Sequence, residues 1–164
     1  MRRLVLILSI FFMLAFGLFA CGTDNSGQSN SNERPNDTED TKQEGDFEVS
    51  INVENENENP EVHATITYIG EKEQKNIYHG GSIFFFNIYQ VNGDFEHIGG
   101  MNEPLLTTTL KKDEVHKVEF DHPSLDELET GEYEFEAIAD FSLDKDNYID
   151  NKREITVSKI VNIK

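Results

Sequence analysis

The chain has 164 residues, of which 32 are acidic and 14 are Lys or Arg, so its formal net charge at pH 7 is −18. A chain this negative does not bind nucleic acid or anionic lipid headgroups through bulk electrostatic attraction. Its single cysteine excludes a disulfide framework within the chain.

A hydrophobic leader opens the chain. Arg2 and Arg3 precede the apolar stretch 4–20, and Cys21 follows it directly. This length lies between a signal-peptide core of about 7 to 15 residues and a membrane-spanning helix of about 20, so it leaves secretion and an uncleaved anchor open. The small residue Ala20, directly before the only cysteine, favours a third reading, in which the cysteine is lipidated after cleavage.

Leu18, Phe19, Ala20 and Cys21 resemble the lipobox of bacterial lipoproteins. The resemblance implies a signal peptide over 1–20, cleavage before Cys21, and palmitate-type acyl chains on that cysteine. Two or three acyl chains hold a protein at a membrane durably, whereas one holds it only marginally. The protein is therefore expected on the extracytoplasmic face of the cell membrane.

Residues 22–45 contain no Ala, Val, Ile, Leu, Met, Phe, Trp, Tyr or Cys and cannot form a core. We interpret 21–45 as the lipidated cysteine followed by a disordered tether. Its r.m.s. span is roughly 25 to 30 Å, which lifts a domain off the lipid headgroups.

Apolar and polar residues alternate from Asp46 onwards, and 46–164 has the length of one domain. Alternation with a period of two is typical of half-buried strands, and the stretch 82–91 is apolar on both faces in its first half. The predicted strands are 47–54, 62–68, 82–91, 95–98, 105–110, 115–120, 133–141 and 155–163. Seven to nine short strands at this spacing predict an all-β antiparallel sandwich.

The stretch Leu128-Glu129-Thr130-Gly131-Glu132-Tyr133 resembles the tyrosine corner of immunoglobulin-like and fibronectin-like sandwiches. The resemblance implies that the Tyr133 hydroxyl bonds to nearby backbone. The succession 83–90, Asn92-Gly93, 108–114 and 131–133 also resembles, loosely, the intracellular proteinase inhibitor (BsuPI-type) domain. That likeness implies protease inhibition, for which 78–82 and 98–104 are the candidate exposed segments.

Catalytic motifs are scarce. The sequence has no G-x-S-x-G elbow, and Cys21 is committed to lipid. His79-Gly80-Gly81 resembles the oxyanion stretch of some esterases, but without a nucleophile elbow we interpret it as a glycine-rich loop. We therefore expect no enzymatic activity, with a small envelope hydrolase as an alternative.

Metal ligands are also sparse in the sequence. The five histidines never fall at H-x-H or H-x-x-x-H spacing, and His63 and His116 are expected on outward faces. Asp144, Asp146 and Asp150 place hard oxygen ligands in one loop, which makes Ca²⁺ the better candidate cofactor. The alternative is a solvated acidic loop. No other cofactor is expected.

Glu132, Glu134 and Glu136 must point to one side if Tyr133, Phe135 and Ala137 face the core. This acidic row is either a solubilising surface or an interaction face for a cationic partner. The sequence thus predicts a membrane-anchored, non-enzymatic binding sandwich with an envelope protein or ligand as its partner, and protease inhibition as the alternative.

Cells given a labelled fatty acid should incorporate the label into the unmodified protein and not into Cys21→Ala, because no other thiol is present. The measurement is the label in the immunoprecipitated protein. Equal labelling of both proteins would contradict the lipobox.

Overall fold

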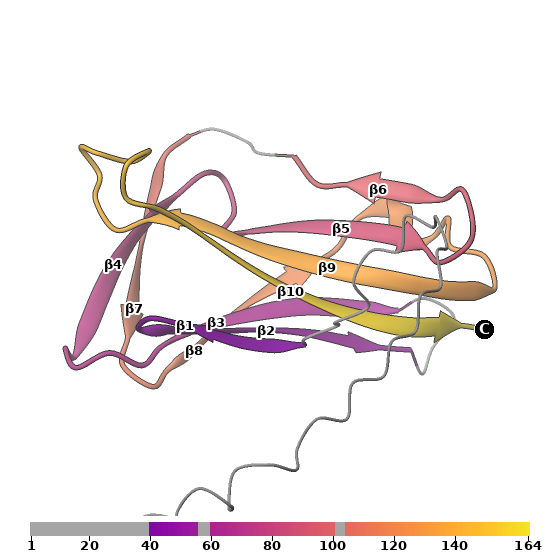
Figure 1. Ribbon diagram of the computed structural model, residues 1–164, viewed down its shortest axis with the longest axis horizontal. Coiled ribbons are helices and arrows are strands. Elements are labelled where there is room, and N and C mark those ends of the chain that lie inside the picture. Colours follow the sequence, from indigo (N-terminus) through magenta and orange to yellow (C-terminus); the bar gives the residue numbers. More distant parts are fainter. Residues whose placement is uncertain (1–39, 56–59, 101–103) are drawn as a thin grey trace, which may run out of the picture. The chain divides into compact units, whose positions relative to one another are not determined.

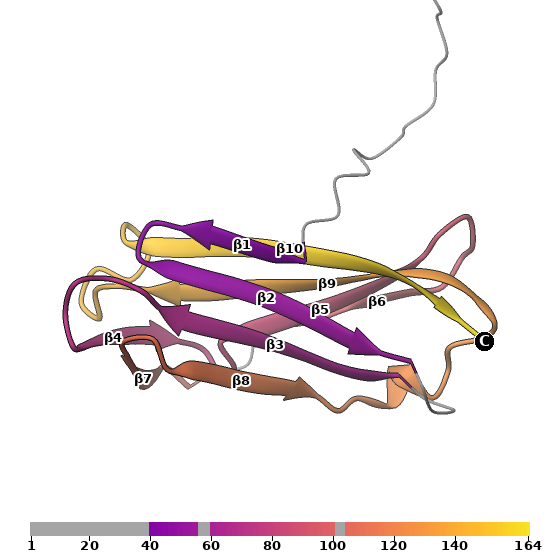
Figure 2. The same cartoon turned by 90° about the horizontal axis from the view of Figure 1, so that it is seen from below.

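The computed structural model describes residues 40–55, 60–100 and 104–164, and these form two antiparallel sheets packed face to face (Figures 1 and 2). Sheet A has the strand order β1-β2-β3-β8. In sheet B the order is β6-β5-β9, with β10 on the other edge of β9. The predicted all-β sandwich is therefore confirmed.

The elements follow the chain in short succession. They are β1 (Thr41–Glu44), β2 (Phe47–Glu54), β3 (Glu61–Tyr68), β4 (Gln74–His79), β5 (Phe84–Gln90), β6 (Glu96–Ile98), β7 (Leu106–Lys111), β8 (Val115–Phe120), the 3₁₀ turn η1 (Pro123–Leu125), β9 (Gly131–Ser142) and β10 (Lys152–Ile163). β4 and β7 pair with each other, and β4 joins the end of β9 through Tyr78 and Ser142. Figure 1 shows this pair at one end of the sandwich.

The core lies between the two sheets and follows the alternation in the sequence. In β2, Phe47, Val49, Ile51 and Val53 are buried, while the residues between them are half-buried or exposed. Each fully buried side chain of this size stabilises the fold by about 1.5 to 3 kcal/mol. Across the core, the inward residues of β9 supply two of the largest fully buried side chains, Phe135 and Phe141.

β5 lies between β6 and β9 in sheet B. Phe84, Phe86 and Ile88 are buried towards sheet A. Phe85 lies on the opposite side of the strand and is only half-buried. A stretch that is apolar on both faces is typical of a strand buried on both sides, and β5 departs from this at Phe85.

β1 corrects the predicted tether, which the sequence extended to residue 45. Thr41–Glu44 pair with 47–50 of β2 through a tight turn at Gly45 and Asp46. Gly45 has φ +59°, a conformation that glycine adopts without steric cost. The strand is mostly exposed and lies at the edge of its sheet, so main-chain pairing holds it and no apolar alternation marks it.

The sequence also missed β4. Its residues read Gln-Lys-Asn-Ile-Tyr-His, and only Ile77 and His79 are buried. Two buried positions, one of them a histidine, do not make an apolar alternation that the sequence reveals. His79 and Tyr78 thus belong to a strand and not to an exposed loop.

Tyr133 forms the predicted corner. Its side chain is 1% exposed, and the Glu129 N–H donates to its hydroxyl oxygen at 3.2 Å. The Phe95 ring packs edge-on against the tyrosine ring, with centroids 5.8 Å apart. The corner thus fixes the turn that leads from η1 into β9.

Tyr133→Phe should lower the free energy of unfolding by about 0.5 to 1.5 kcal/mol, because the Glu129 N–H loses its acceptor. Urea denaturation of both proteins measures the difference. The matched control is Tyr78→Phe, at a half-buried tyrosine of the neighbouring strand pair. Equal stability of Tyr133→Phe and the parent protein would show that the hydroxyl bond contributes nothing.

Candidate interaction surface

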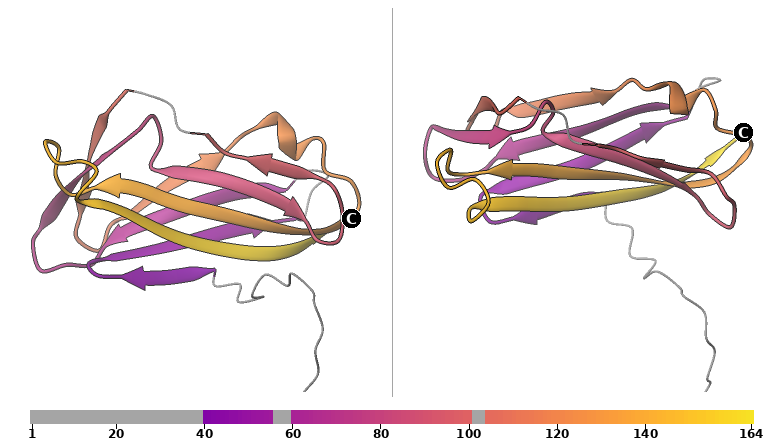
Figure 3. Two further views of the ribbon diagram at one scale, coloured as in Figure 1. Left: turned by 45° about the horizontal axis from the view of Figure 1, so that its top comes forward. Right: turned by 90° about the horizontal axis from the view of Figure 1, so that it is seen from above.

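The outer side of sheet B is the candidate site. Antiparallel partners share a face, so the register aligns its outward residues in rows across β6, β5, β9 and β10. One row is Ile98, Asn87, Glu136 and Ser158, and the next is Glu96, Tyr89, Glu134 and Ile160. We call this the sheet B outer surface; Figure 3 shows its strands side by side.

Apolar side chains interrupt the polarity of this surface. Phe85 lies directly opposite Ile138, and both are half-buried. Tyr89 and Ile160 flank Glu134 from either side and are also half-buried. Ile98 is 62% exposed at the β6 edge. Five large apolar or aromatic side chains therefore lie among carboxylates on one face.

The acidic row has the predicted orientation. Glu132, Glu134 and Glu136 lie on the outer side of β9, because the residues that alternate with them are buried. Successive outward residues of a strand are about 7 Å apart, so the row extends over about 13 to 14 Å. Among the ion pairs of residues 40–55, 60–100 and 104–164, none involves these three carboxylates.

Asn87 anchors one end of the row. Its Nδ2 donates to Glu136 Oε2 at 2.6 Å, and its Oδ1 accepts from the Gly99 N–H at 3.0 Å. Asn87 is buried although it lies on the outer side of β5. Glu136 is therefore fixed in place, and Glu134 lies between Tyr89 and Ile160.

A buried carboxylate closes the other end of this surface. Asp140 is 3% exposed, Lys152 Nζ lies 2.9 Å from its Oδ2, and the Tyr148 hydroxyl donates to its Oδ1 at 3.5 Å. Lys152 also binds Glu154 at 2.6 Å. Hydrogen bonds to Glu154 and Asp140 raise the pKa of Lys152, and burial followed by Asp140 raises the pKa of Tyr148. The one cation on this surface is thus occupied by two carboxylates.

The outer side of sheet A has a different composition. Ser50 and Thr65 share a hydrogen bond of 2.7 Å, and Lys117 pairs with Glu119 at 3.1 Å. The other outward residues of β2 and β3 are polar: Glu48, Asn52, Glu54, Glu61, His63 and Thr67. Val115, at the start of β8, is the exposed large apolar residue on this side. The outer side of sheet A is therefore mostly polar, whereas the outer side of sheet B mixes carboxylates with apolar and aromatic side chains.

The loop predicted to bind calcium is held by its own hydrogen bonds. Asp144 Oδ1 accepts from the amides of Asp146 and Asn147 at 2.9 and 3.3 Å, so its carboxylate stabilises a turn. In the described ranges, no group of three or more His, Cys, Asp and Glu side chains is placed to hold a metal ion. Calcium binding by Asp144, Asp146 and Asp150 stays a prediction.

His79 stabilises the fold, and His63 and His116 can be compared with the faces expected from the sequence. His79 is buried, with Nδ1 2.7 Å from the Gly80 carbonyl oxygen and Nε2 2.8 Å from Thr108 Oγ1, so it ties β4 to β7. Burial lowers its pKa, against hydrogen bonds to the Gly80 and Ser82 backbone. His63 faces outwards as expected, but His116 pairs with Ile66 and lies on its core-facing side, so that expectation is wrong.

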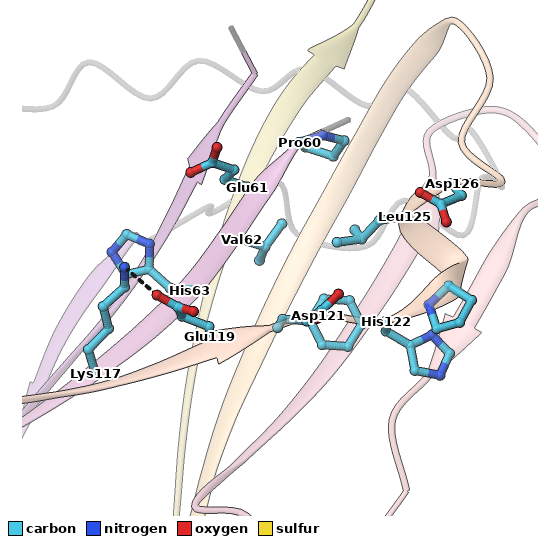
Figure 4. A pocket seen from close by; sticks show the side chains of 12 residues that line it. Pro60, Glu61, Val62, His63, Lys117, Glu119, Asp121, His122, Leu125 and Asp126 are labelled. Atoms are coloured by element: carbon cyan, nitrogen blue, oxygen red, sulfur yellow. Dashed lines mark ion pairs between the residues drawn. The ribbon is translucent and has the colours of Figure 1, made fainter. Parts of the chain in front are cut away.

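A groove lies on the side of the sandwich near η1. It has a volume of about 750 Å³ and is lined by β3, β8 and η1 (Figure 4). Its walls mix carboxylates such as Asp121 and Asp126 with apolar residues such as Val62 and Leu125. Its described lining residues offer carboxylates, imidazoles and the Lys117 amine, and they include no Ser, Thr or Cys.

Several predictions fall outside what the structure describes. Leu18, Phe19, Ala20 and Cys21 lie before residue 40, and the candidate inhibitory segment 98–104 includes residues 101–103. From residue 40 onwards, within the described ranges, no helix has the length and apolar character needed to span a membrane. No protein-family model and no curated protein match the chain.

Lys152→Met should lower the free energy of unfolding by about 2 to 3 kcal/mol, because it leaves the Asp140 carboxylate buried without its cation. The effect is smaller than for a fully buried pair, since the Lys152 side chain is 32% exposed. Lys42→Met, which removes an exposed pair of 3.9 Å with Glu44, should change stability by less than about 0.5 kcal/mol. Similar losses in the two variants, measured by urea denaturation, would contradict the role of Asp140.

Proposed function

We propose that this protein is a membrane-anchored extracytoplasmic lipoprotein whose sandwich binds a partner protein through the sheet B outer surface, without catalysis. One observation carries the proposal, namely the difference between the two outer faces. A sandwich that serves only as a spacer has no need of Phe85, Tyr89, Ile98, Ile138 and Ile160 on one outer face. The polar side of sheet A supplies the internal comparison.

The chemistry of the surface favours a cationic, amphipathic partner. Tyr89 and Ile160 provide apolar contact on both sides of Glu134, and Glu132 and Glu136 extend the acidic row beyond it. A Lys or Arg side chain matches this arrangement, since its alkyl stem packs on apolar atoms while its charged end meets a carboxylate. Charge complementarity of this kind raises association rates and excludes unsuitable partners.

The same charges argue against other occupants. A second copy would place Glu132, Glu134 and Glu136 against an equally acidic face, which costs free energy through like-charge repulsion. Anionic lipid headgroups and nucleic acid phosphates are repelled for the same reason. A basic segment of an envelope protein remains the best match to the surface.

Anchoring on Cys21 fits this proposal. A protein held at the membrane meets its partners at high local concentration, so a modest interaction surface suffices for capture. The carboxylates on both sides of the sandwich also keep the domain away from an anionic membrane. The apolar residues of sheet B then remain available to a partner.

Site-specific photocrosslinking in cells tests the proposal. A photoreactive residue at Tyr89 should form a defined crosslinked product, whereas one at Thr65 should not, because the two positions lie on the outer sides of central strands in opposite sheets. Equal products from both positions would contradict a dedicated face.

Charge variants then separate binding from solubility. Glu134→Gln with Glu136→Gln should reduce the Tyr89 crosslink about ten-fold and weaken its dependence on salt. The matched variant, Glu48→Gln with Glu54→Gln, removes the same charge from the outer side of sheet A and should leave the crosslink unchanged. Equal losses in both would indicate a general effect of net charge.

A further inference from the structure

His122 occupies an unusual position for an imidazole. It is the N-cap of η1, and its Nδ1 accepts the Ser124 N–H at 3.1 Å. The Ser124 hydroxyl lies 3.0 Å from the same nitrogen. Asn, Asp, Ser and Thr are the common N-cap residues, and their side-chain oxygens accept a hydrogen bond over a wide pH range. An imidazole accepts one at Nδ1 only while that nitrogen carries no proton.

Loss of this bond has consequences for the turn. Ser124 is buried, so its N–H would be left without an acceptor unless the turn moved to reach water. The following residue, Leu125, is also buried and belongs to the hydrophobic core. The cap on Ser124 therefore helps to hold an apolar side chain in the core.

The imidazole is open to solvent yet packed on rings from other elements. His122 stacks on Phe120 of β8 at 5.6 Å, and Phe120 stacks on Phe86 of β5 at 4.8 Å. His97 of β6 lies 4.4 Å from His122 between ring centroids. A proton on His122 is thus added beside a second imidazole and above an aromatic column that reaches the core.

Charged groups around the imidazole act in both directions. Burial lowers the pKa of His97, His122 lowers it further, and Glu127 opposes them. Asp121 at the end of β8 and Asp126 after η1 line the same groove, together with Lys117, Glu119, Glu61 and His63. A proton added to His122 therefore meets charges of both signs in this groove.

We propose that His122 is an acid-sensitive N-cap: protonation at Nδ1 in mildly acidic medium breaks the bond from the Ser124 N–H and releases the η1 turn, with Leu125, from the core. The proton comes from solvent, since His122 is exposed. The uncapped turn binds one more proton than the capped turn, so falling pH favours release.

The experiment uses the ¹⁵N-labelled protein and follows the hydrogen-exchange protection of the Ser124 amide together with the His122 ring resonances. Protection should fall about five-fold between pH 7.5 and 5.0, in step with protonation of the ring, because a cap contributes about 1 kcal/mol. A His122 ring that titrates while Ser124 keeps its protection would overturn the proposal. So would a ring that stays neutral down to pH 5.0.

His122→Asn is the decisive variant, because asparagine caps a helical turn without a titratable group. Its Ser124 amide should stay protected at both pH values, whereas His122→Ala should be unprotected at both. A pH-dependent loss of protection in His122→Asn that equals that of the parent protein would assign the effect to another group.

Discussion

The structure depends on the alternation of side chains along β9, the strand that pairs with β5 on one edge and with β10 on the other. Its inward residues, among them Phe135 and Phe141, fill the core, so its outward residues must form the middle of the sheet B outer surface. Core and surface are thus two consequences of one period-two pattern. The Tyr133 corner determines where this strand begins and which of its sides faces inwards.

Electrostatics limit how such an acidic sandwich can be built. The domain cannot neutralise its carboxylates, so most are left in solvent, where screening makes repulsion tolerable. Asp140 is the exception: it is buried at the end of the surface and requires Lys152. Because Lys152 is held there by Asp140 and Glu154, it is not free to neutralise Glu132 or Glu134. Lys152 therefore stabilises the fold, and the acidic row has no ion pair among the described residues.

Sequence reasoning succeeded where a residue's environment follows from its immediate neighbours. The alternation after Tyr133 correctly predicted a strand over 133–141, and it correctly placed Glu132, Glu134 and Glu136 on the outer side of that strand. It failed at β1, whose polar residues are held by main-chain pairing, and at His116, whose face depends on the register with β3. Ile138 occupies an outward position of the same alternation, but its apolar character was not singled out as part of a surface. The contact of His97 with His122, by contrast, could not be predicted, because it joins β6 to the start of η1 and depends on how these two elements pack.

The histidine pair and the proposed binding surface meet at β6. This strand has only three residues, Glu96–Ile98, and pairs with β5 alone in the described part of the sheet. Its outward residues, Glu96 and Ile98, belong to the sheet B outer surface, while His97 points inwards against His122 and Phe120. Release of η1 would remove His122 from the inner side of β6, so the acid-sensitive cap and the binding surface share one short, weakly held strand. A partner that contacts Ile98 would hold β6 in place and thereby favour the capped turn, because linkage between two sites is reciprocal.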